Sequence, residues 1–522
     1  MSNWVDHLRA AVGQNDRRIA EYLTAQRWFG AKGRTINGVS MSDYAVLSEI
    51  PQPAVLAIFD IEYADNAHDH YLLPLVIRFE HGIDASHEPT IVTFQHQSET
   101  AAALDATTDA AACFAILEGI RQEHTWQGTG GRFTCVQISS DESIESLPLR
   151  HVKRVATEQS NTSLIYDSQA ILKLIRKLER GVNPDCEIME FLTANTSYRH
   201  VPALLGHIRY ETEPRTAEEP AWSATVAVLQ SFVPNEGDGW TMTLRHLEGL
   251  LSDSRSHEDA NTPSQAVVHI RTYSGNFLSR MRCLGEITAG LHVALASDTA
   301  DAAFRPEPMT QGDVERWQTA LRGEIHTVLQ HVRAMSDKVL EPLSLSRETL
   351  GGLEAACLDK TADASLLTTH RVMKIRIHGD YHLGQVLDTN PGFTILDFEG
   401  EPARTLEERR TKTCPLKDVA GMLRSFNYAG HVALRQSKSS SALDRRLLEA
   451  WEQETVEAFL SSYYAVAKPG DVAFLPDSPY AAARLLALFQ LEKAIYELRY
   501  EINNRPDWIE IPIQGLRRLI GQ

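Results

Sequence analysis

Three polar residues in the C-terminal half of the chain have the spacing of a metal-dependent phosphoryl-transfer centre. Asp380 lies within His378–Gln385, and Gln385 and Asp397 follow it by five and seventeen residues. In such a centre one Asp accepts the proton of the attacking hydroxyl, while an amide five residues later and a second Asp hold the metal ion. The spacing therefore predicts Asp380 as the catalytic residue. It also predicts Gln385 and Asp397 as Mg²⁺ ligands, with Glu399 as a further ligand.

The residues between these positions predict the hairpin that would bring them together. Residues 386–387 and 393–396 are apolar, and Asn390-Pro391-Gly392 between them is a strong turn signal. A hairpin here would carry Asp397 back beside residues 378–385, the predicted catalytic loop. Either short motif alone occurs by chance, and an Asp at a strand end is common; both motifs together, in this order, favour the catalytic interpretation.

A helix predicted to begin near Cys414 adds a structural prediction. Asp418 would lie in its first turn, where the helix dipole favours a carboxylate. From that position we expect Asp418 to brace the backbone of the catalytic loop.

Length and composition define the class of protein. A chain of 522 residues suffices for about two or three domains, and 43% hydrophobic with 23% charged residues is typical of soluble globular proteins. The net charge of −18 argues against nucleic acid as the main partner. Six scattered cysteines, no signal-peptide core and no bilayer-spanning stretch predict a cytoplasmic protein without a membrane partner.

Changes along the chain predict three parts. Residues 1–112 read as a small α+β module without catalytic residues, 113–233 as a nucleotide-binding lobe of mixed β structure, and 234–522 as a mainly helical lobe with the catalytic loop and acceptor site. The segment 234–240 breaks all regular patterns and is predicted as the hinge at which adenine would bond the main chain. Gln230 and Phe232, just before it, are therefore predicted nucleotide contacts.

A lysine on an apolar strand marks the nucleotide-binding lobe. Lys173 alternates with leucines and is unfavourable there unless it is paired. The helix predicted after Asn183-Pro184 supplies the acid. Glu187 is the preferred partner and Glu190 the alternative, while a Lys173 side chain that reaches the surface is a third interpretation.

A small polar loop precedes that strand. Its amides and hydroxyls could wrap phosphate oxygens as a Gly-rich loop does, although it contains no glycine. The predicted phosphate contacts are Gln159, Ser160, Asn161 and Thr162.

The predicted helix 485–504 carries the candidate acceptor site. Tyr496 and Tyr500 share one face, with charged residues beside them. Rings and paired charges suit a sugar, although an ordinary solvated helix face is the alternative. The predicted sugar contacts are His382, Lys493, Tyr496, Glu497, Tyr500, Arg505 and Trp508.

With these residues in view, the chain resembles the bacterial maltokinases, from the branch of eukaryotic-like kinases that includes aminoglycoside phosphotransferases. The resemblance runs from near the N-terminus to near the end. The matching segments are 27–33, 158–163, 172–174, 181–185, 232–240, 378–385, 397–402, 415–426, 491–501 and 504–508.

The resemblance implies an α+β, bilobal protein-kinase-like fold with an N-terminal α+β cap, a mixed β N-lobe and a mainly helical C-lobe. It implies ATP and Mg²⁺ as cofactors and phosphorylation of maltose at its anomeric hydroxyl, which gives maltose 1-phosphate for α-glucan (glycogen) synthesis. Compared with typical relatives the chain is longer, with polar insertions at 62–70, 211–220 and 252–264.

Two alternatives stay open. Relatives on the same scaffold phosphorylate glucosamine or other amino sugars, and an aminoglycoside is a related acceptor. A nucleotide-binding pseudokinase that associates with a trehalose synthase is the non-enzyme alternative. The intact set of Lys173, Asp380, Gln385 and Asp397 argues against it.

Overall fold

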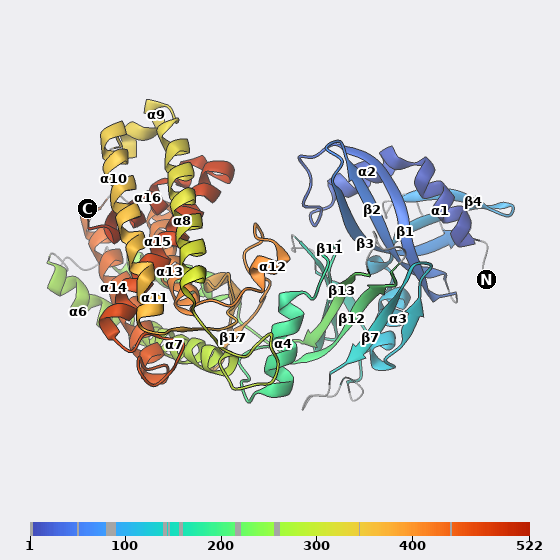
Figure 1. Cartoon of the computed structure of the whole chain (residues 1–522). Coiled ribbons are helices and arrows are strands. Elements are labelled where there is room, and N and C mark those ends of the chain that lie inside the picture. Colours follow the sequence, from blue (N-terminus) through green and yellow to red (C-terminus); the bar gives the residue numbers. More distant parts are fainter. Residues whose placement is uncertain are drawn as a thin grey trace. The chain divides into compact units, whose positions relative to one another are not determined.

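The computed structural model describes residues 4–49, 52–79, 90–138, 144, 147–155, 160–214, 221–254, 262–343, 345–438 and 441–521. The chain forms two compact units, Met1–Pro234 and Asn235–Gln522 (Figure 1). The first is rich in sheet and the second is mainly helical. The predicted α+β class is therefore confirmed, and the division between the units lies in the predicted hinge segment. The three-part domain division stays a prediction.

The first sheet of unit 1 is antiparallel, with strand order β1-β2-β3-β5-β4. Helices α1 and α2 pack against β1 and α1 against β4. The elements are α1 (Trp4–Gln14), α2 (Asp16–Ala25), β1 (Ile36–Ser48), β2 (Ala54–Tyr63), β3 (His68–Phe79), β4 (Val92–His96) and β5 (Glu99–Asp105).

Strand β2 shows how this sheet is buried on both faces. Side chains alternate across a strand, and in β2 both alternating sets are apolar. Phe59 and Ile61 belong to the core shared with α1 and α2, while Leu56 and Ile58 belong to a second core. The near-continuous apolar sequence of β2 thus reflects a strand between two cores.

The second sheet of unit 1 has the order β6-β7-β12-β13-β10-β9-β8. Helix α3 shares its core through Ile116 and Leu117. The elements are η2 (Ala106–Thr108), α3 (Ala110–Arg121), β6 (Thr125–Gln127), β7 (Gly131–Gln137), β8 (Val152–Arg154), β9 (Thr162–Tyr166), β10 (Ala170–Leu174), α4 (Pro184–Asn195), β12 (Leu204–Thr212) and β13 (Ser223–Ser231).

A short strand and a buried ion pair join the two sheets. After β10 of the second sheet, the chain forms the short strand β11 (Lys177–Leu178), and this strand pairs with β3 of the first sheet. Just before it, Arg176 is fully buried and its Nη2 lies 2.8 Å from Asp105 Oδ2. A buried arginine without its acid would be strongly destabilising, so this pair ties the first sheet to the second.

Unit 2 is built from helices and two short two-stranded antiparallel sheets, β14–β15 and the hairpin β16–β17. Its elements are α5 (Gly239–Ser254), α6 (Pro263–Tyr273), α7 (Gly275–Leu295), β14 (Glu307–Pro308), α8 (Gln311–Arg333), α9 (Asp337–Leu340), η4 (Glu341–Leu343), α10 (Arg347–Lys360), η5 (Thr361–Ser365), α11 (Leu366–Thr369), β15 (Met373–Lys374), η6 (Leu383–Gln385), β16 (Val386–Thr389), β17 (Gly392–Ile395), α12 (Leu406–Arg409), α13 (Leu416–Ser437), α14 (Ala442–Val466), α15 (Pro479–Asn504), η7 (Pro506–Trp508) and α16 (Glu510–Leu519).

Helix α13 is the central helix for the site. It is buried along most of its length and contacts α5, α14, α15 and α16. Gly421 lets it approach the catalytic loop, because a Cβ there would lie only 2.5 Å from the Tyr381 carbonyl oxygen.

No helix in the described ranges combines the length and apolar character needed to cross a bilayer. All six cysteines are free thiols.

Candidate active site

The predicted hairpin forms and places the predicted metal ligands side by side. Strands β16 and β17 pair antiparallel, with Val386 opposite Ile395 and Thr389 opposite Gly392. The Leu396 N–H donates to the Gln385 carbonyl at 2.9 Å, and the Gln385 side-chain amide donates to Asp397 Oδ2 at 3.0 Å. The hairpin prediction is confirmed. Amide and carboxylate oxygens at this position suit a hard cation such as Mg²⁺.

The backbone at Asp397 is unusual. Its φ is 66°, and a residue other than glycine in this left-handed region costs about 1–3 kcal/mol. The preceding residue is held by the His378 ring, whose Nε2 donates to the Leu396 carbonyl at 2.8 Å. Strain is thus located at a predicted metal ligand, in a segment fastened to the catalytic loop.

Asp418 braces the catalytic loop as predicted. Its Oδ2 accepts from the His378 N–H at 2.8 Å, and its Oδ1 accepts from the Gly379 N–H at 2.9 Å. His292 Nε2 lies 3.2 Å from the same carboxylate, and His292 Nδ1 lies 2.9 Å from the Tyr463 hydroxyl. Burial raises the pKa of Asp418, but the His292 contact and the loop N–H groups lower it overall.

Asp418→Asn is expected to destabilise the protein by about 2–4 kcal/mol at pH 7, because an amide NH₂ would face a loop N–H in a buried place. The pKa of Asp418 is lower in the folded than in the unfolded state. Its stabilisation is therefore complete above the unfolded value of about 3.9 and is lost as the pH falls below it. Urea unfolding at pH 7 and at about pH 3, which is below the unfolded value, measures both effects. The exposed Asp359→Asn is the control, and equal stability of Asp418→Asn and wild type at pH 7 would contradict the bracing role.

Lys493, on α15, is the ion-pair partner of the predicted catalytic residue. Its Nζ lies 2.9 Å from Asp380 Oδ1 and 3.0 Å from Glu401 Oε1. Burial lowers the pKa of Lys493, but the two carboxylates raise it well above its ordinary range. For Asp380, burial raises the pKa and Lys493 lowers it, with a net decrease. Both groups are therefore charged at neutral pH.

Three of the predicted sugar contacts gather at Asp380. His382 Nε2 lies 4.0 Å from Asp380 Oδ2, and Lys493 is bonded to the same carboxylate. The Tyr496 ring centroid lies 4.6 Å from the Lys493 ammonium, at cation–π distance. Asp380, with Lys493 and these two rings, is the centre of the candidate site.

The other predicted sugar contacts have different surroundings. Glu497 pairs with the buried Arg424, at 2.6 Å from Nη2, so its carboxylate serves an internal ion pair. Arg505 follows Lys493 by twelve residues, which is about 18 Å along α15 at 1.5 Å per residue. Arg505 lies over the rings of Tyr500 and Trp508, at 5.5 and 4.9 Å. The contacts of Glu497, Arg505 and Trp508 are thus with residues other than Asp380, and Tyr500 is half-exposed beside Arg505. Sugar contacts at these four residues stay predictions.

A cavity of about 440 Å³ opens beside the catalytic loop at Gly379. Helix α8 contributes Trp317, whose indole N–H donates to Glu492 Oε1 at 3.1 Å. Lys417 pairs with the same carboxylate at 3.1 Å. An aromatic ring among paired charges is the composition that binds sugar hydroxyls. Sequence reasoning did not assign Trp317 or Lys417 to the site, because nothing in the local pattern separates them from ordinary helix residues.

Glu401 was also missed, although its segment was recognised. It is 5% exposed, lies 3.0 Å from Lys493, and its Oε2 lies 3.4 Å from Arg404 Nε. A usable signal was its position four residues after Asp397 in a short segment with three acids, since carboxylates that become buried need partners.

In unit 1, the acid beside Lys173 is Asp185. Lys173 Nζ lies 3.2 Å from Asp185 Oδ2, and that carboxylate is nearly inaccessible. Sequence reasoning did not name Asp185 as a partner of Lys173, and the predicted roles of Glu187 and Glu190 stay predictions. Asn183 caps α4 by accepting from the Asp185 N–H at 2.8 Å, so α4 begins next to β10. At about 100° per residue, Glu187 lies about 200° around the helix from Asp185.

The predicted phosphate loop is only partly described. Gln159 lies outside the described residues, Ser160 is exposed, and Asn161 and Thr162 are buried. The Thr162 hydroxyl accepts from Arg176 Nε at 2.9 Å, so it supports the ion pair between the sheets. A phosphate-binding role for this loop stays a prediction.

The two predicted adenine contacts lie at the end of β13. Gln230 is opposite Ile171 of β10. The Phe232 N–H donates to the Gln169 carbonyl at 2.9 Å. That N–H is already used within the unit, and adenine contacts at both residues stay predictions.

Comparison with known proteins agrees with this architecture. Residues 22–109 match the family model of the maltokinase N-terminal cap domain. A glucosamine kinase of Streptacidiphilus jiangxiensis is 23% identical over 377 residues, covering 72% of this chain and 75% of that protein. A glucosamine kinase of Mycolicibacterium smegmatis (strain ATCC 700084 / mc(2)155) is 24% identical over 392 residues, covering 75% and 84%.

Solved structures show the same fold over the whole chain. A glucosamine kinase in complex with glucosamine, ADP and inorganic phosphate superposes with a TM-score of 0.64 at 19% identity, covering 99% of each chain. A second crystal form of glucosamine kinase gives 0.66 at 18% identity, covering 100% of each. The chain therefore has a kinase-like fold, its residues 22–109 are similar to the maltokinase N-terminal cap domain, and its sequence is similar to glucosamine kinases.

Proposed function

We propose that this protein is an ATP-dependent sugar kinase that phosphorylates maltose at its anomeric hydroxyl, giving maltose 1-phosphate for α-glucan synthesis. The observation that carries the kinase chemistry is the arrangement in unit 2. Asp380 is held as a carboxylate by Lys493, and Gln385 and Asp397 are hydrogen-bonded to each other in the adjoining hairpin. The similarity to glucosamine kinases supports a sugar or amino-sugar acceptor.

The proposed reaction is a direct in-line transfer. The sugar hydroxyl oxygen forms a bond to the γ-phosphorus, the bond from that phosphorus to the bridging oxygen of ADP breaks, and the hydroxyl proton passes to Asp380. Asp397 and Gln385, with Glu399, would hold Mg²⁺, which neutralises phosphate charge. In unit 1, Lys173 would contact the phosphates, steadied by Asp185. Such catalysis rests on positioning and charge neutralisation.

The paired charges around the cavity favour a neutral sugar over an amino sugar. Glu492 is paired with Lys417, and Glu324 with Arg499 at 2.9 Å. Glu401 is shared by Lys493 and Arg404. An ammonium group on the acceptor would need a carboxylate of its own, and Lys493 beside Asp380 would repel it. This observation supports a neutral sugar such as maltose. Glu492 Oε2, which has no hydrogen-bond partner among the described residues, and the glucosamine kinase relatives favour glucosamine as the second candidate.

ADP release from Mg-ATP tests the proposal, with maltose, glucose, glucosamine, an aminoglycoside and a blank without sugar. Strong stimulation by maltose alone is expected. Stimulation by glucosamine instead would keep the kinase mechanism and replace the substrate. No turnover with any sugar, despite ATP binding, would favour the pseudokinase that associates with trehalose synthase.

Lys173→Met is expected to lower kcat/KM for ATP about 10²–10³-fold, because a positioned cation on the phosphates is lost. Asp185→Asn should give a smaller decrease of about 10-fold, since Lys173 keeps its charge but loses its position. Steady-state kinetics with varied ATP measures both. Glu187→Gln is the matched control on the same helix, and a larger effect of Glu187→Gln than of Asp185→Asn would contradict the assignment of Asp185.

A further inference from the structure

A buried histidine in unit 1 has no hydrogen-bond partner. His207, on β12, is 3% exposed, and neither its Nδ1 nor its Nε2 is hydrogen-bonded among the described residues. Buried polar groups in folded proteins are nearly always satisfied, and each exception calls for a ligand, an ion or an ordered water. The proposed kinase mechanism uses neither His207 nor the face of β12 on which it lies.

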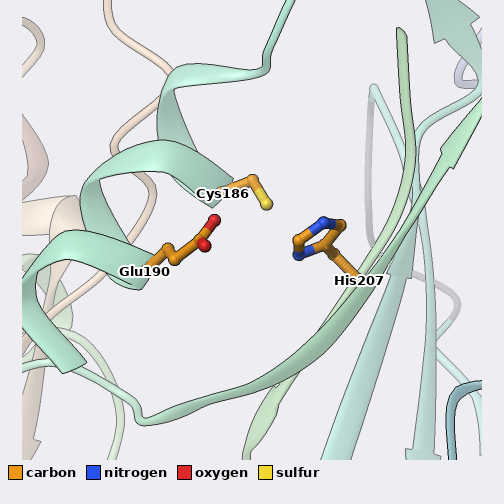
Figure 2. A group of neighbouring side chains, drawn as sticks. All are labelled: Cys186, Glu190 and His207. Carbon is orange, nitrogen blue, oxygen red and sulfur yellow. The ribbon is translucent and has the colours of Figure 1, made fainter. Parts of the chain in front are cut away.

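Two further metal-ligand types face this imidazole. Cys186 and Glu190 are four residues apart on α4 and therefore project from one face of the helix. Figure 2 shows both side chains directed toward His207 across the space between α4 and β12. One ligand atom from each of the three residues lies within 4.8 Å of the others. Cys186 and His207 are buried and Glu190 is half-buried.

We propose that Cys186, Glu190 and His207 form a binding site for Zn²⁺. Sulfur, imidazole nitrogen and carboxylate oxygen together are donors that Zn²⁺ accepts, whereas Mg²⁺ and Ca²⁺ prefer oxygen alone. Pairs of ligands on a tetrahedral Zn²⁺ lie about 3.3–3.6 Å apart. The present separations thus need only small side-chain rotations. Three protein ligands leave one coordination position to solvent.

The charge balance of the site is compatible with burial. A thiolate and a carboxylate together neutralise the two charges of Zn²⁺, while the imidazole ligand is neutral. The nearby cation Arg209 lies 4.0 Å from Glu211, at salt-bridge distance. A neutral complex avoids the large desolvation penalty of an uncompensated ion in the interior.

The site would fasten α4 to the second sheet. Cys186 directly follows Asp185, the acid that pairs with Lys173, and both lie in the first turn of α4. At the other end of this helix, Thr193 Oγ1 already accepts from the Leu204 N–H at 3.1 Å. Zn²⁺ would thus hold the first half of α4 on β12. Binding itself does not depend on the proposed sugar kinase function.

Metal content and Co²⁺ spectroscopy of the purified full chain test the site. After chelator treatment and dialysis, the wild type is expected to bind about one Zn²⁺ per chain. Substitution by Co²⁺ should give thiolate-to-metal charge-transfer absorption. Cys186→Ser should abolish that absorption, and His207→Gln and Glu190→Gln should weaken Zn²⁺ binding about 10-fold or more. Cys135→Ser, which removes a buried thiol from neighbouring β7, is the matched control and should bind as the wild type does.

A thermal shift keeps the test valid if a variant loses stability. Zn²⁺ is expected to raise the Tm of the wild type and of Cys135→Ser, because a ligand bound only by the folded state stabilises it. It should leave the Tm of Cys186→Ser unchanged, whatever that variant's starting value. Absence of Zn²⁺ and Co²⁺ binding by the wild type, or a Co²⁺ spectrum of Cys186→Ser like that of the wild type, would overturn the proposal.

Discussion

Asp380→Asn is expected to lower kcat about 10²–10⁴-fold, the usual contribution of a positioned general base. Asparagine has nearly the same shape, and Lys493 keeps Glu401 as a partner at 3.0 Å. The fold and the KM for ATP should therefore change little. ADP release at saturating Mg-ATP and sugar measures the loss, and urea unfolding measures the stability.

Asp388→Asn is a matched control eight residues further along the chain. Asp388 is also buried and ion-paired, in this case with Arg280 on α7. The control should lose some stability and keep most of its turnover. Substantial activity of purified Asp380→Asn, or an equal loss in the control, would remove Asp380 from the role of base.

Lys493→Met is expected to have two large effects. It leaves Asp380 and Glu401 as buried carboxylates without this shared cation. We expect a loss of about 3–5 kcal/mol in the free energy of unfolding at pH 7. The second effect is on the pH dependence of kcat/KM. In the wild type the net shift places the pKa of Asp380 below its ordinary value, so the base stays ionised and activity does not fall as the pH decreases from 8 to 5.

The sign of the change follows from the two opposing causes. Burial raises the pKa of Asp380, and Lys493 is the first of the groups that lower it. Without Lys493 the effect of burial dominates. The acidic limb of the profile should therefore move upward, into the range above about pH 4. Lys493→Arg keeps the positive charge, so the acidic limb of its kcat/KM profile should stay close to that of the wild type.

Lys417→Met separates the loss of stability from the pH effect. Lys417 is another partly buried lysine, paired with Glu492 rather than with Asp380, at 3.1 Å. The Lys417→Met variant should lose about as much stability as Lys493→Met. The acidic limb of its kcat/KM profile should stay where it is in the wild type. A Lys493→Met profile that coincides with that of the wild type would show that Lys493 does not keep the base ionised.

Features encoded by local spacing were predictable from the sequence. The turn at Asn390-Pro391-Gly392 brings Asp397 next to Gln385 because a short hairpin admits few geometries. Asp418 braces the loop because a first-turn carboxylate can accept from N–H groups presented to the helix start. The α+β class followed in the same way from alternating apolar runs in the first half and helical periodicity in the second.

Contacts that depend on helix phase were not predictable. A sequence shows that α4 can supply an acid to Lys173, but the rotation of the helix against β10 is what places Asp185 beside it. The rotation of α15 about its own axis could not be predicted from the sequence either. Glu497 and Lys493 are one turn apart, yet Glu497 pairs with Arg424 and Lys493 faces Asp380.

Residue types and local spacing were enough to propose the chemistry: they named the predicted base, the predicted pair of metal ligands and the lysine predicted to contact the phosphates. The tertiary structure alone decided which charges neutralise them. Lys493 meets Asp380 and Glu401 across 113 and 92 residues of chain, and Cys186 meets His207 only because α4 packs on β12. Backbone geometry constrains positions a few residues apart. Contacts between distant segments depend instead on how buried faces pack, and that is a property of the whole fold.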